Sequence, residues 1–200
     1  MKKAVKKSTS KKTKIILLGI ALVLCIAAVL AIVLIYNPTP SLDKFTNSIL
    51  EKKNFKMTTV ISYFPYAGKT EQICEVDGNL QHILPSDSEV ETYFETVGNT
   101  RYVYTKDGGK WYRYVSEDED FFEALTQLLN PENYEPVPGE KNTYQQKSNV
   151  SFETFKDVKI IIDGNVLAIE MTTISDGMAF ETLVMFSDVG KIRLTLPAVE

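Results

Sequence analysis

Cysteine and histidine are scarce in this chain, which has two cysteines and one histidine in 200 residues. Cys25 lies in a long apolar run near the N-terminus, so Cys74 is the single cysteine of the remainder and no intrachain disulfide can form there. Zinc centres need several thiolate or imidazole ligands, and one thiol with His82 does not supply them. The sequence therefore excludes a disulfide scaffold and a zinc site, and the fold must be stabilised by apolar packing.

Motifs for catalysis are also missing. A hydrolase triad needs a nucleophile, a base and an orienting acid, and although His82 could act as a base, the sequence has no Gly-x-Ser-x-Gly elbow. Cys74 lies in a strand-like run without a catalytic setting. The acidic run over residues 117–120 lacks the spacing and the glycine of a calcium-binding EF-hand loop. We therefore predict a protein without catalytic residues, cofactor or bound metal.

One stretch without any charge dominates the sequence, residues 15–36, IILLGIALVLCIAAVLAIVLIY. As a helix it would be about 33 Å long, enough to cross a hydrocarbon layer about 30 Å thick. Seven lysines and no acidic residue precede it, and basic flanks stay in the cytoplasm. We predict a single-pass cell membrane protein with a cytoplasmic N-terminus and with residues 37–200 extracellular.

A cleaved signal peptide and a lipid-modified cysteine are the alternatives to an uncleaved anchor. The apolar region of a cleaved signal is about 7 to 15 residues long and ends at small residues, whereas this run is longer and ends in the bulky residues 33–36. Leu24 stands before Cys25, where bacterial lipoprotein signals have a small residue. Both features favour an uncleaved signal-anchor.

The chain organisation follows from this anchor. We expect a basic cytoplasmic arm over residues 1–14, the membrane helix over 15–36, a short linker over 37–40 and one extracytoplasmic domain over 41–200. Without the seven lysines of the arm, 15 basic residues face 26 acidic residues, a net charge of −11. An acidic domain repels phosphate backbones, so nucleic acid is excluded as a partner. The shortage of cysteine favours a bacterial cell-envelope protein.

Two amphipathic helices are predicted in the extracytoplasmic domain. Ser41 can cap a helix over residues 41–53, whose apolar residues share one side. A second helix over residues 118–130 begins at a capping box formed by Ser116 and Glu119 and ends before a proline. This second helix has the strongest helix signal outside the membrane segment.

Short alternating runs separated by turn residues predict antiparallel strands. The turns contain Gly-Asn or Gly-Gly, which favour tight hairpins. A loop rich in glycine, proline and polar residues is expected over residues 131–149. The predicted strands cover residues 56–64, 70–76, 80–84, 89–97, 101–105, 110–115, 155–162, 166–173, 180–186 and 192–196.

This order of elements resembles the LolA/LppX-like family of bacterial envelope domains, which are outer-membrane lipoprotein carrier-like. The resemblance covers residues 41–196 and includes the stretches Tyr102-Val103-Tyr104 and Lys110-Trp111-Tyr112. It implies an α+β fold in which a curved, incompletely closed antiparallel β-sheet (half-barrel) wraps around two or three helices. It also implies that a lipid can be held between the sheet and the helices. Members of that family are free carriers or lipid-anchored, whereas this chain has a predicted membrane helix.

Candidate ligand-binding residues come from the second helix and from the aromatic hairpin around residues 107–109. The helix carries one apolar stripe, which must be buried against the core or against a ligand. The hairpin aromatics are expected to face each other across the two strands, where such pairs stabilise a sheet, or to line a ligand cleft. The candidates are Phe121, Phe122, Leu125, Leu128, Leu129, Tyr104 and Trp111.

We therefore expect a membrane-anchored, non-enzymatic domain that holds a lipid or another apolar ligand between the curved sheet and the helices. The alternative is an envelope interaction or sensory domain, in which side chains fill the cleft and the outer surface binds a protein partner. The two hypotheses differ in whether the apolar stripe of the second helix is shared with a ligand.

The topology can be tested with fusions. A reporter that is active only outside the membrane should work when fused after Glu200 and fail when fused before Met1, because the lysine arm keeps the N-terminus inside. Reporter activity in bacterial cells measures both outcomes. A mature chain that starts near Asn37 in the culture medium would contradict the uncleaved anchor.

Overall fold

The computed structural model of this chain describes residues 40–63, 68–85, 91–117, 122–175 and 177–199. The chain divides into two compact units, Met1–Pro38 and Thr39–Glu200. The predicted arm, membrane helix and most of the linker lie outside the described residues. Within the described part, no helix has the length and apolarity needed to cross a membrane.

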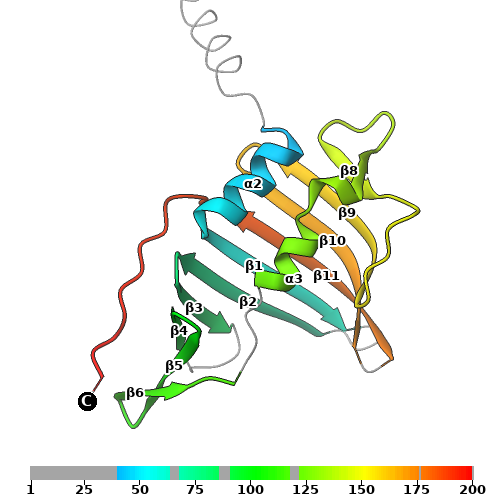
Figure 1. Cartoon of the computed structure of the whole chain (residues 1–200). Coiled ribbons are helices and arrows are strands. Elements are labelled where there is room, and N and C mark those ends of the chain that lie inside the picture. The colour runs from blue at the N-terminus through cyan, green and yellow to red at the C-terminus, as the bar shows by residue number, and fades with distance from the viewer. Residues whose placement is uncertain (1–39, 64–67, 86–90, 118–121, 176, 200) are drawn as a thin grey trace, which may run out of the picture. The chain divides into compact units, whose positions relative to one another are not determined.

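The domain is built on one large antiparallel sheet of eleven strands (Figure 1). The strands follow the order β6-β5-β4-β3-β2-β1-β11-β10-β9-β8-β7, and the sheet does not close into a barrel. This confirms the prediction of a single open antiparallel sheet with few helices. The strands are β1 (Asn54–Tyr63), β2 (Gly68–Asp77), β3 (Leu80–Pro85), β4 (Thr92–Val97), β5 (Thr100–Asp107), β6 (Lys110–Val115), β7 (Tyr134–Pro136), β8 (Thr143–Gln146), β9 (Phe155–Asp163), β10 (Val166–Ser175) and β11 (Met178–Ser187).

Two meanders make up this sheet, β1 to β6 and β7 to β11. They are joined where β1 pairs with β11, with Val60 opposite Leu183. As a result, β6 and β7 lie at opposite edges of the sheet although they are consecutive strands in the sequence. The chain between them must cross the sheet, and helix α3 (Phe122–Leu128) lies in this crossover (Figure 1).

The predicted Gly-Asn and Gly-Gly turns close the hairpins with two-residue loops. Asp77 pairs with Leu80 and Asp163 pairs with Val166, so each loop consists of a glycine and an asparagine. Gly78 has φ +64°, a left-handed backbone conformation that a side chain would strain. Glycine at the first loop position suits the hairpin turns whose twist matches that of the strands.

Helix α2 (Leu42–Lys52) and helix α3 lie over the same face of the sheet (Figure 1). The side of α2 that bears Leu42, Phe45 and Ile49 is buried, as its pattern predicts. Ser41 occupies the N-cap position of α2, as predicted, and its carbonyl accepts from the Phe45 N–H (3.0 Å), but its side chain makes no capping hydrogen bond. The core between the helices and the sheet contains Leu42, Phe45, Ile49, Phe55, Val76, Phe122, Leu125, Leu128, Leu129, Ile160, Leu167, Ile169, Val184 and Phe186.

The predicted loop over residues 131–149 contains regular structure. A short 3-10 helix, η1 (Pro131–Asn133), leads into β7, and β8 follows. These strands form because β8 pairs with β9, with Thr143 opposite Ile161, and because Tyr134 is buried in the core. Their polar, unpatterned sequences gave no local signal for this pairing.

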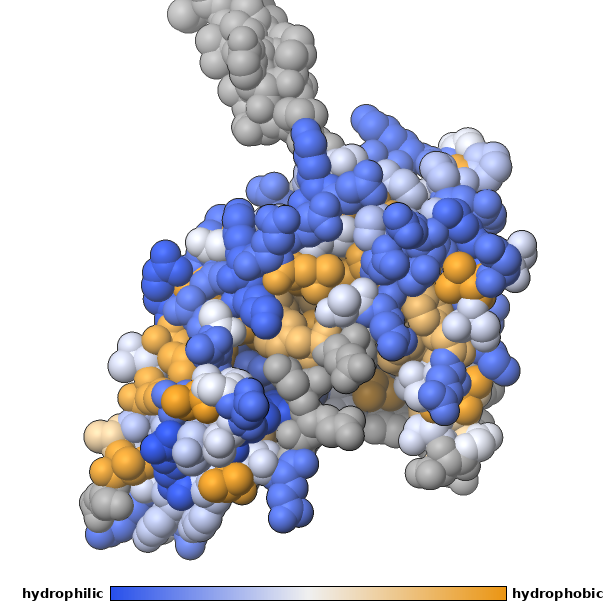
Figure 2. All heavy atoms as spheres, viewed as in Figure 1, coloured by the Kyte–Doolittle hydropathy of each residue, from blue (hydrophilic) through white to orange (hydrophobic). Residues whose placement is uncertain are grey.

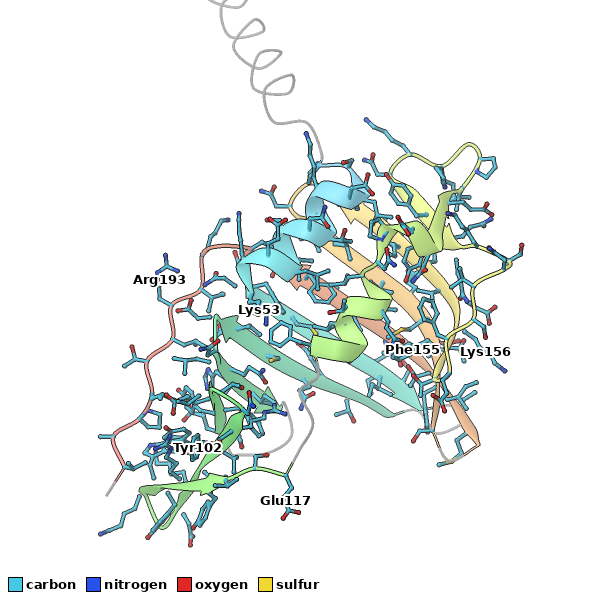
Figure 3. All side chains as sticks on the ribbon, viewed as in Figure 1. Lys53, Tyr102, Glu117, Phe155, Lys156 and Arg193 are labelled. Atoms are coloured by element: carbon cyan, nitrogen blue, oxygen red, sulfur yellow. The ribbon has the colours of Figure 1, made fainter. Side chains whose placement is uncertain are left out.

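The strand predicted over residues 192–196 is wrong, because this segment pairs with side chains and not with a neighbouring strand. Asn54 accepts a hydrogen bond from the Ile192 N–H (2.9 Å) and donates one to the Ile192 carbonyl (2.9 Å). The Asp77 carboxylate accepts from the Leu194 N–H (3.1 Å). Ile192 and Leu194 are half-buried while Arg193 is exposed and points away from the domain (Figure 3). The alternating pattern thus reflects an extended tail held by two side chains.

The clamp formed by Asn54 and Asp77 can be tested by substitution. Asn54 is buried and also donates to Asp77 at 2.6 Å, so Asn54→Ala should lower the free energy of unfolding by about 1 to 3 kcal/mol, as buried groups lose their partners. It should also speed proteolytic cleavage of residues 190–199. Urea denaturation and limited proteolysis measure the two effects, with the exposed Asn149→Ala as control. A tail that stays protected would contradict the clamp.

Candidate functional site

The apolar stripe of α3 forms part of the core beneath the helices. Leu129 is fully buried, Phe122 is 9% exposed, and Leu125 and Leu128 lie between these values. Phe121 and the predicted start of this helix lie outside the described residues. The structure thus brings four of the predicted ligand-binding residues together against one apolar face of the sheet.

Contacts to neighbouring segments hold both ends of α3. At the C-terminal end, the Tyr134 hydroxyl donates to the Leu128 carbonyl (2.6 Å) and the Asn133 amide donates to the Gln127 carbonyl (3.0 Å). At the other end, the Phe122 ring meets the Phe55 ring edge-on at 6.2 Å and the Lys53 ammonium at 4.7 Å. Burial raises the pKa of the Tyr134 hydroxyl well above its usual range, so Tyr134 keeps the proton that it donates.

Helix α2 contributes the strained residue at this end of the site. Lys53 ends α2 in the left-handed region, with φ 44°, and its N–H donates to the Ile49 carbonyl (3.0 Å). A left-handed conformation is uncommon for a residue with a side chain, and here it turns the chain directly from α2 into β1. Figure 3 shows Lys53 between α2 and α3, which places its ammonium over the Phe122 ring.

Three cavities formed by described residues lie elsewhere on the domain, and their lining does not include the described residues of the α3 stripe. One of about 240 Å³ lies beside the start of α2 and is lined by Lys44, Phe45, Val189 and Lys191 among others. A second, of about 660 Å³, lies along β8 and β9 and has a largely polar lining. A third, of about 440 Å³, lies over β1, β9, β10 and β11. These cavities are thus separate from the buried side chains of Phe122, Leu125 and Leu128.

Tyr104 and Trp111 lie on the face of the sheet that the helices do not cover. Alternate residues of a strand point to opposite faces, and residues directly opposite in neighbouring strands share a face. On β2, Val76 is buried beneath the helices, so its neighbour Glu75 points to the other face. Trp111 shares the face of Arg113, two residues along β6. The row that contains Tyr104 runs from Glu75 through His82, Tyr93 and Tyr104 to Arg113.

The sheet therefore separates the predicted site residues into two groups. Tyr104 and Trp111 are not brought together with the stripe of α3. Figure 3 shows the same separation, with Tyr102 of the aromatic hairpin far from Lys53 and α3. Cys74 and His82 are likewise on opposite faces, because Cys74 pairs with Ile83 and His82 pairs with Glu75.

Aromatic residues of the β5–β6 hairpin are not directly opposite one another across the strands, which corrects the expected cross-strand pairing, although Tyr112 and Tyr114 stack along β6 at 6.5 Å. Tyr104 is opposite Arg113, and Trp111 is opposite Lys106. The Arg113 guanidinium lies 3.6 Å from the Tyr102 ring centre, and the Lys106 ammonium lies 5.7 Å from that of Trp111. Such cation–π contacts stabilise by about 0.5 to 2 kcal/mol each.

Carboxylates complete this polar network. Glu95 accepts hydrogen bonds from the Tyr104 hydroxyl (2.6 Å) and from Arg113 (3.2 Å). Burial, followed by the hydrogen bond and charge of Glu95, raises the pKa of Tyr104. Tyr104 therefore serves as a protonated donor at neutral pH, which gives it a structural role on this face.

His82 occupies the centre of a second polar cluster, which local sequence patterns did not predict. Its two ring nitrogens lie 3.4 Å from Glu75 and 2.9 Å from Glu91, and its ring stacks on Tyr93 at 4.2 Å. Burial and Glu91 raise the pKa of Tyr93 to about 12. The two carboxylates lie at different nitrogens of the ring, and among the described residues no three such side chains converge as metal ligands. Only the strand register, with His82 between Glu75 and Tyr93, could have revealed the cluster.

The comparisons with known proteins give no family for this chain. No protein-family model matches the sequence, and no curated protein is similar to it. Function must therefore be argued from the geometry of the domain.

The chemistry of Cys74 gives a test of the buried face. Burial is the main cause that raises the pKa of this thiol from 9.0 to about 12, with a smaller opposing effect of Arg101. Since the thiolate is the reactive form, Cys74 in a Cys25→Ser variant should react with a disulfide reagent at about pH 8 only when urea unfolds the chain. Absorbance of the released thiol measures the rate, and fast reaction of the folded chain would contradict this burial.

The same shift sets the direction of a pH effect. The unfolded thiol ionises near pH 9.0 and the folded thiol near pH 12, so the folded chain holds this proton more tightly. Its contribution to stability should be complete below pH 9.0 and should be lost as the pH rises towards 12. A Cys74→Ala variant provides the control, because it should lack this part of the alkaline destabilisation.

Proposed function

We propose that this chain is a non-enzymatic binding domain of the cell envelope, anchored by residues 15–36, that takes a lipid or another apolar ligand between α3 and the sheet. The observation that carries the proposal is the attachment of α3. Hydrogen bonds from Tyr134 and Asn133 fix its C-terminal end, and the Phe122 ring lies against Phe55 and the Lys53 ammonium. On this proposal, α3 pivots about its C-terminal end when a ligand enters.

The surface beneath α3 supports an apolar ligand. The sheet residues there include Phe55, Val184 and Phe186, all buried in the core, and Met57 and Ile83 are packed at its margin. Figure 2 shows apolar atoms gathered in the middle of the helix-bearing face, bordered by hydrophilic ones. Apolar surface gains about 25 cal/mol per Å² when it leaves water, so an alkyl chain can replace the contacts of a displaced α3.

The alternative function is an interaction domain with a filled interior. The observation that favours it is the burial of every described stripe residue of α3, together with cavities that lie away from this helix. In that case, α3 is a permanent part of the core and the outer surface binds an envelope protein.

Native mass spectrometry of residues 39–200, purified from a bacterial host, separates these functions. Bound lipid that survives purification and exchanges with added lipid supports the binding function. A domain that is always free of ligand, and that added lipid does not occupy, would overturn it and favour the alternative.

Two matched substitutions test the role of α3. Ile49→Ala on α2 should lower the free energy of unfolding by about 2 to 5 kcal/mol, as expected for a buried core residue, without changing lipid occupancy per folded molecule. Leu125→Ala on α3 should also destabilise the ligand-free domain, because Leu125 is only 6% exposed, but unlike Ile49→Ala it should sharply reduce lipid occupancy. Urea denaturation and native mass spectrometry give the two values. Equal core-sized losses with unchanged occupancy would mean that α3 is ordinary core.

A further inference from the structure

The two edges of the sheet differ in how they are protected. Exposed edge strands can pair with other chains, and short length, proline and charged side chains prevent this. At one edge, β7 has three residues and ends in Pro136. At the other edge, β6 has six residues and no proline, and most of its side chains are exposed. Among the described strands, β6 is therefore the edge at which another strand can be added.

The backbone of β6 presents hydrogen-bonding groups on its free side. The Ser116 N–H donates to the Arg101 carbonyl of β5 (2.8 Å). Because backbone direction alternates along a strand, Tyr114 and Tyr112 also bond towards β5. Trp111, Arg113 and Val115 then direct their N–H and carbonyl groups away from the sheet.

The charge of Arg113, at the middle of β6, does not prevent strand pairing at this edge. The Arg113 guanidinium lies over the Tyr102 ring at 3.6 Å and donates to Glu95 at 3.2 Å, and both partners belong to the inner strands β5 and β4. Arg113 is therefore turned back over its own sheet. The side chains left at the edge are large and exposed, with Tyr114 55% and Val115 65% exposed.

The hairpin is also basic within an acidic domain. Residues 100–115 contain Arg101, Lys106, Lys110 and Arg113 against the single acid Asp107. Because Arg113 pairs with Glu95, the excess of positive charge comes from the other three cations, while residues 37–200 as a whole carry a net charge of −11. Two copies of a basic hairpin repel each other, whereas a negatively charged strand is attracted to it. Charge thus favours an acidic partner over self-association.

We propose that the free edge of β6 binds an extended, acidic peptide segment of another protein by strand addition. The backbone groups of Trp111, Arg113 and Val115 supply the hydrogen bonds, as in other β-augmentation interfaces. The basic hairpin selects acidic side chains, and Tyr112 and Tyr114 cover apolar ones. This site is independent of the apolar ligand proposed beneath α3, because it lies at the edge of the sheet.

A short peptide of alternating glutamate and valine serves as the probe. The same peptide with lysine in place of each glutamate is the charge control. The full chain in detergent micelles should bind the acidic peptide about tenfold or more tightly than the basic one. Amide hydrogen exchange at Trp111, Arg113 and Val115 should slow when the acidic peptide is added. Fluorescence anisotropy measures the affinities.

A proline at the free edge tests strand addition directly. Val115→Pro removes an N–H that points away from β5, so the hairpin should persist, while affinity for the acidic peptide should fall about tenfold or more. Val115→Thr, which keeps the N–H, should bind like the unchanged chain. If Val115→Pro disrupts the hairpin, the proposal is tested instead by the amide exchange and by the comparison of the acidic and basic peptides, both on the unchanged chain.

Three results would overturn the proposal. One is equal binding of the acidic and basic peptides, or no binding of either. Another is an unchanged affinity in a folded Val115→Pro variant. The third is slow amide exchange at Trp111, Arg113 and Val115 in the chain alone together with a dimer in solution, which would assign this edge to a second copy.

Discussion

The pairing of β1 with β11 is the constraint on which the rest of the domain depends. It joins two meanders into one sheet and places their far ends, β6 and β7, at opposite edges. The chain must then cross the sheet between these edges, and a crossing segment can be stable only if the side towards the sheet is apolar. The stripe of Phe122, Leu125 and Leu128 on α3 meets this requirement. The feature that suggests a ligand-binding lid is thus first of all a consequence of strand order.

The same sheet divides the chemistry of the domain between two faces. Beneath the helices, apolar side chains from β1, β2, β9, β10 and β11 form the core. On the other face, aromatic rings, cations and carboxylates contact one another, as in Arg113 with Tyr102 and Glu95. A partly exposed polar face of this kind can remain in water, whereas the apolar face must be covered. Each face therefore has its own candidate for function, α3 on one and the β6 edge beside the other.

The sequence predicted those features that depend on neighbouring residues. The loop of Gly78 and Asn79 was predictable because a two-residue hairpin turn needs positive φ angles, and the apolar side of α2 was predictable from its helical spacing. Strands β7 and β8 were missed because their pairing with β9 is set by tertiary contacts, while residues 192–196 alternate like a strand but bond to Asn54 and Asp77. The placement of Tyr104 away from α3 depends on strand register, since a shift of one residue would move it to the other face.

The helical spacing of apolar residues predicted that the α3 stripe is buried, but it cannot show whether a ligand shares that space. The free-energy cost of exposing the stripe limits which ligands can do so. Exposing the side chains of Phe122 and Leu125 to water costs about 1.5 to 3 kcal/mol each, so a pivot about the Tyr134 end would leave the open state as a minor population. An apolar ligand that covers the same area regains these contacts. Its apparent association constant is the intrinsic constant multiplied by the fraction of molecules that are open. A ligand can therefore bind well only if it has more apolar surface than these two side chains. A lipid chain has that surface, whereas a small polar metabolite does not.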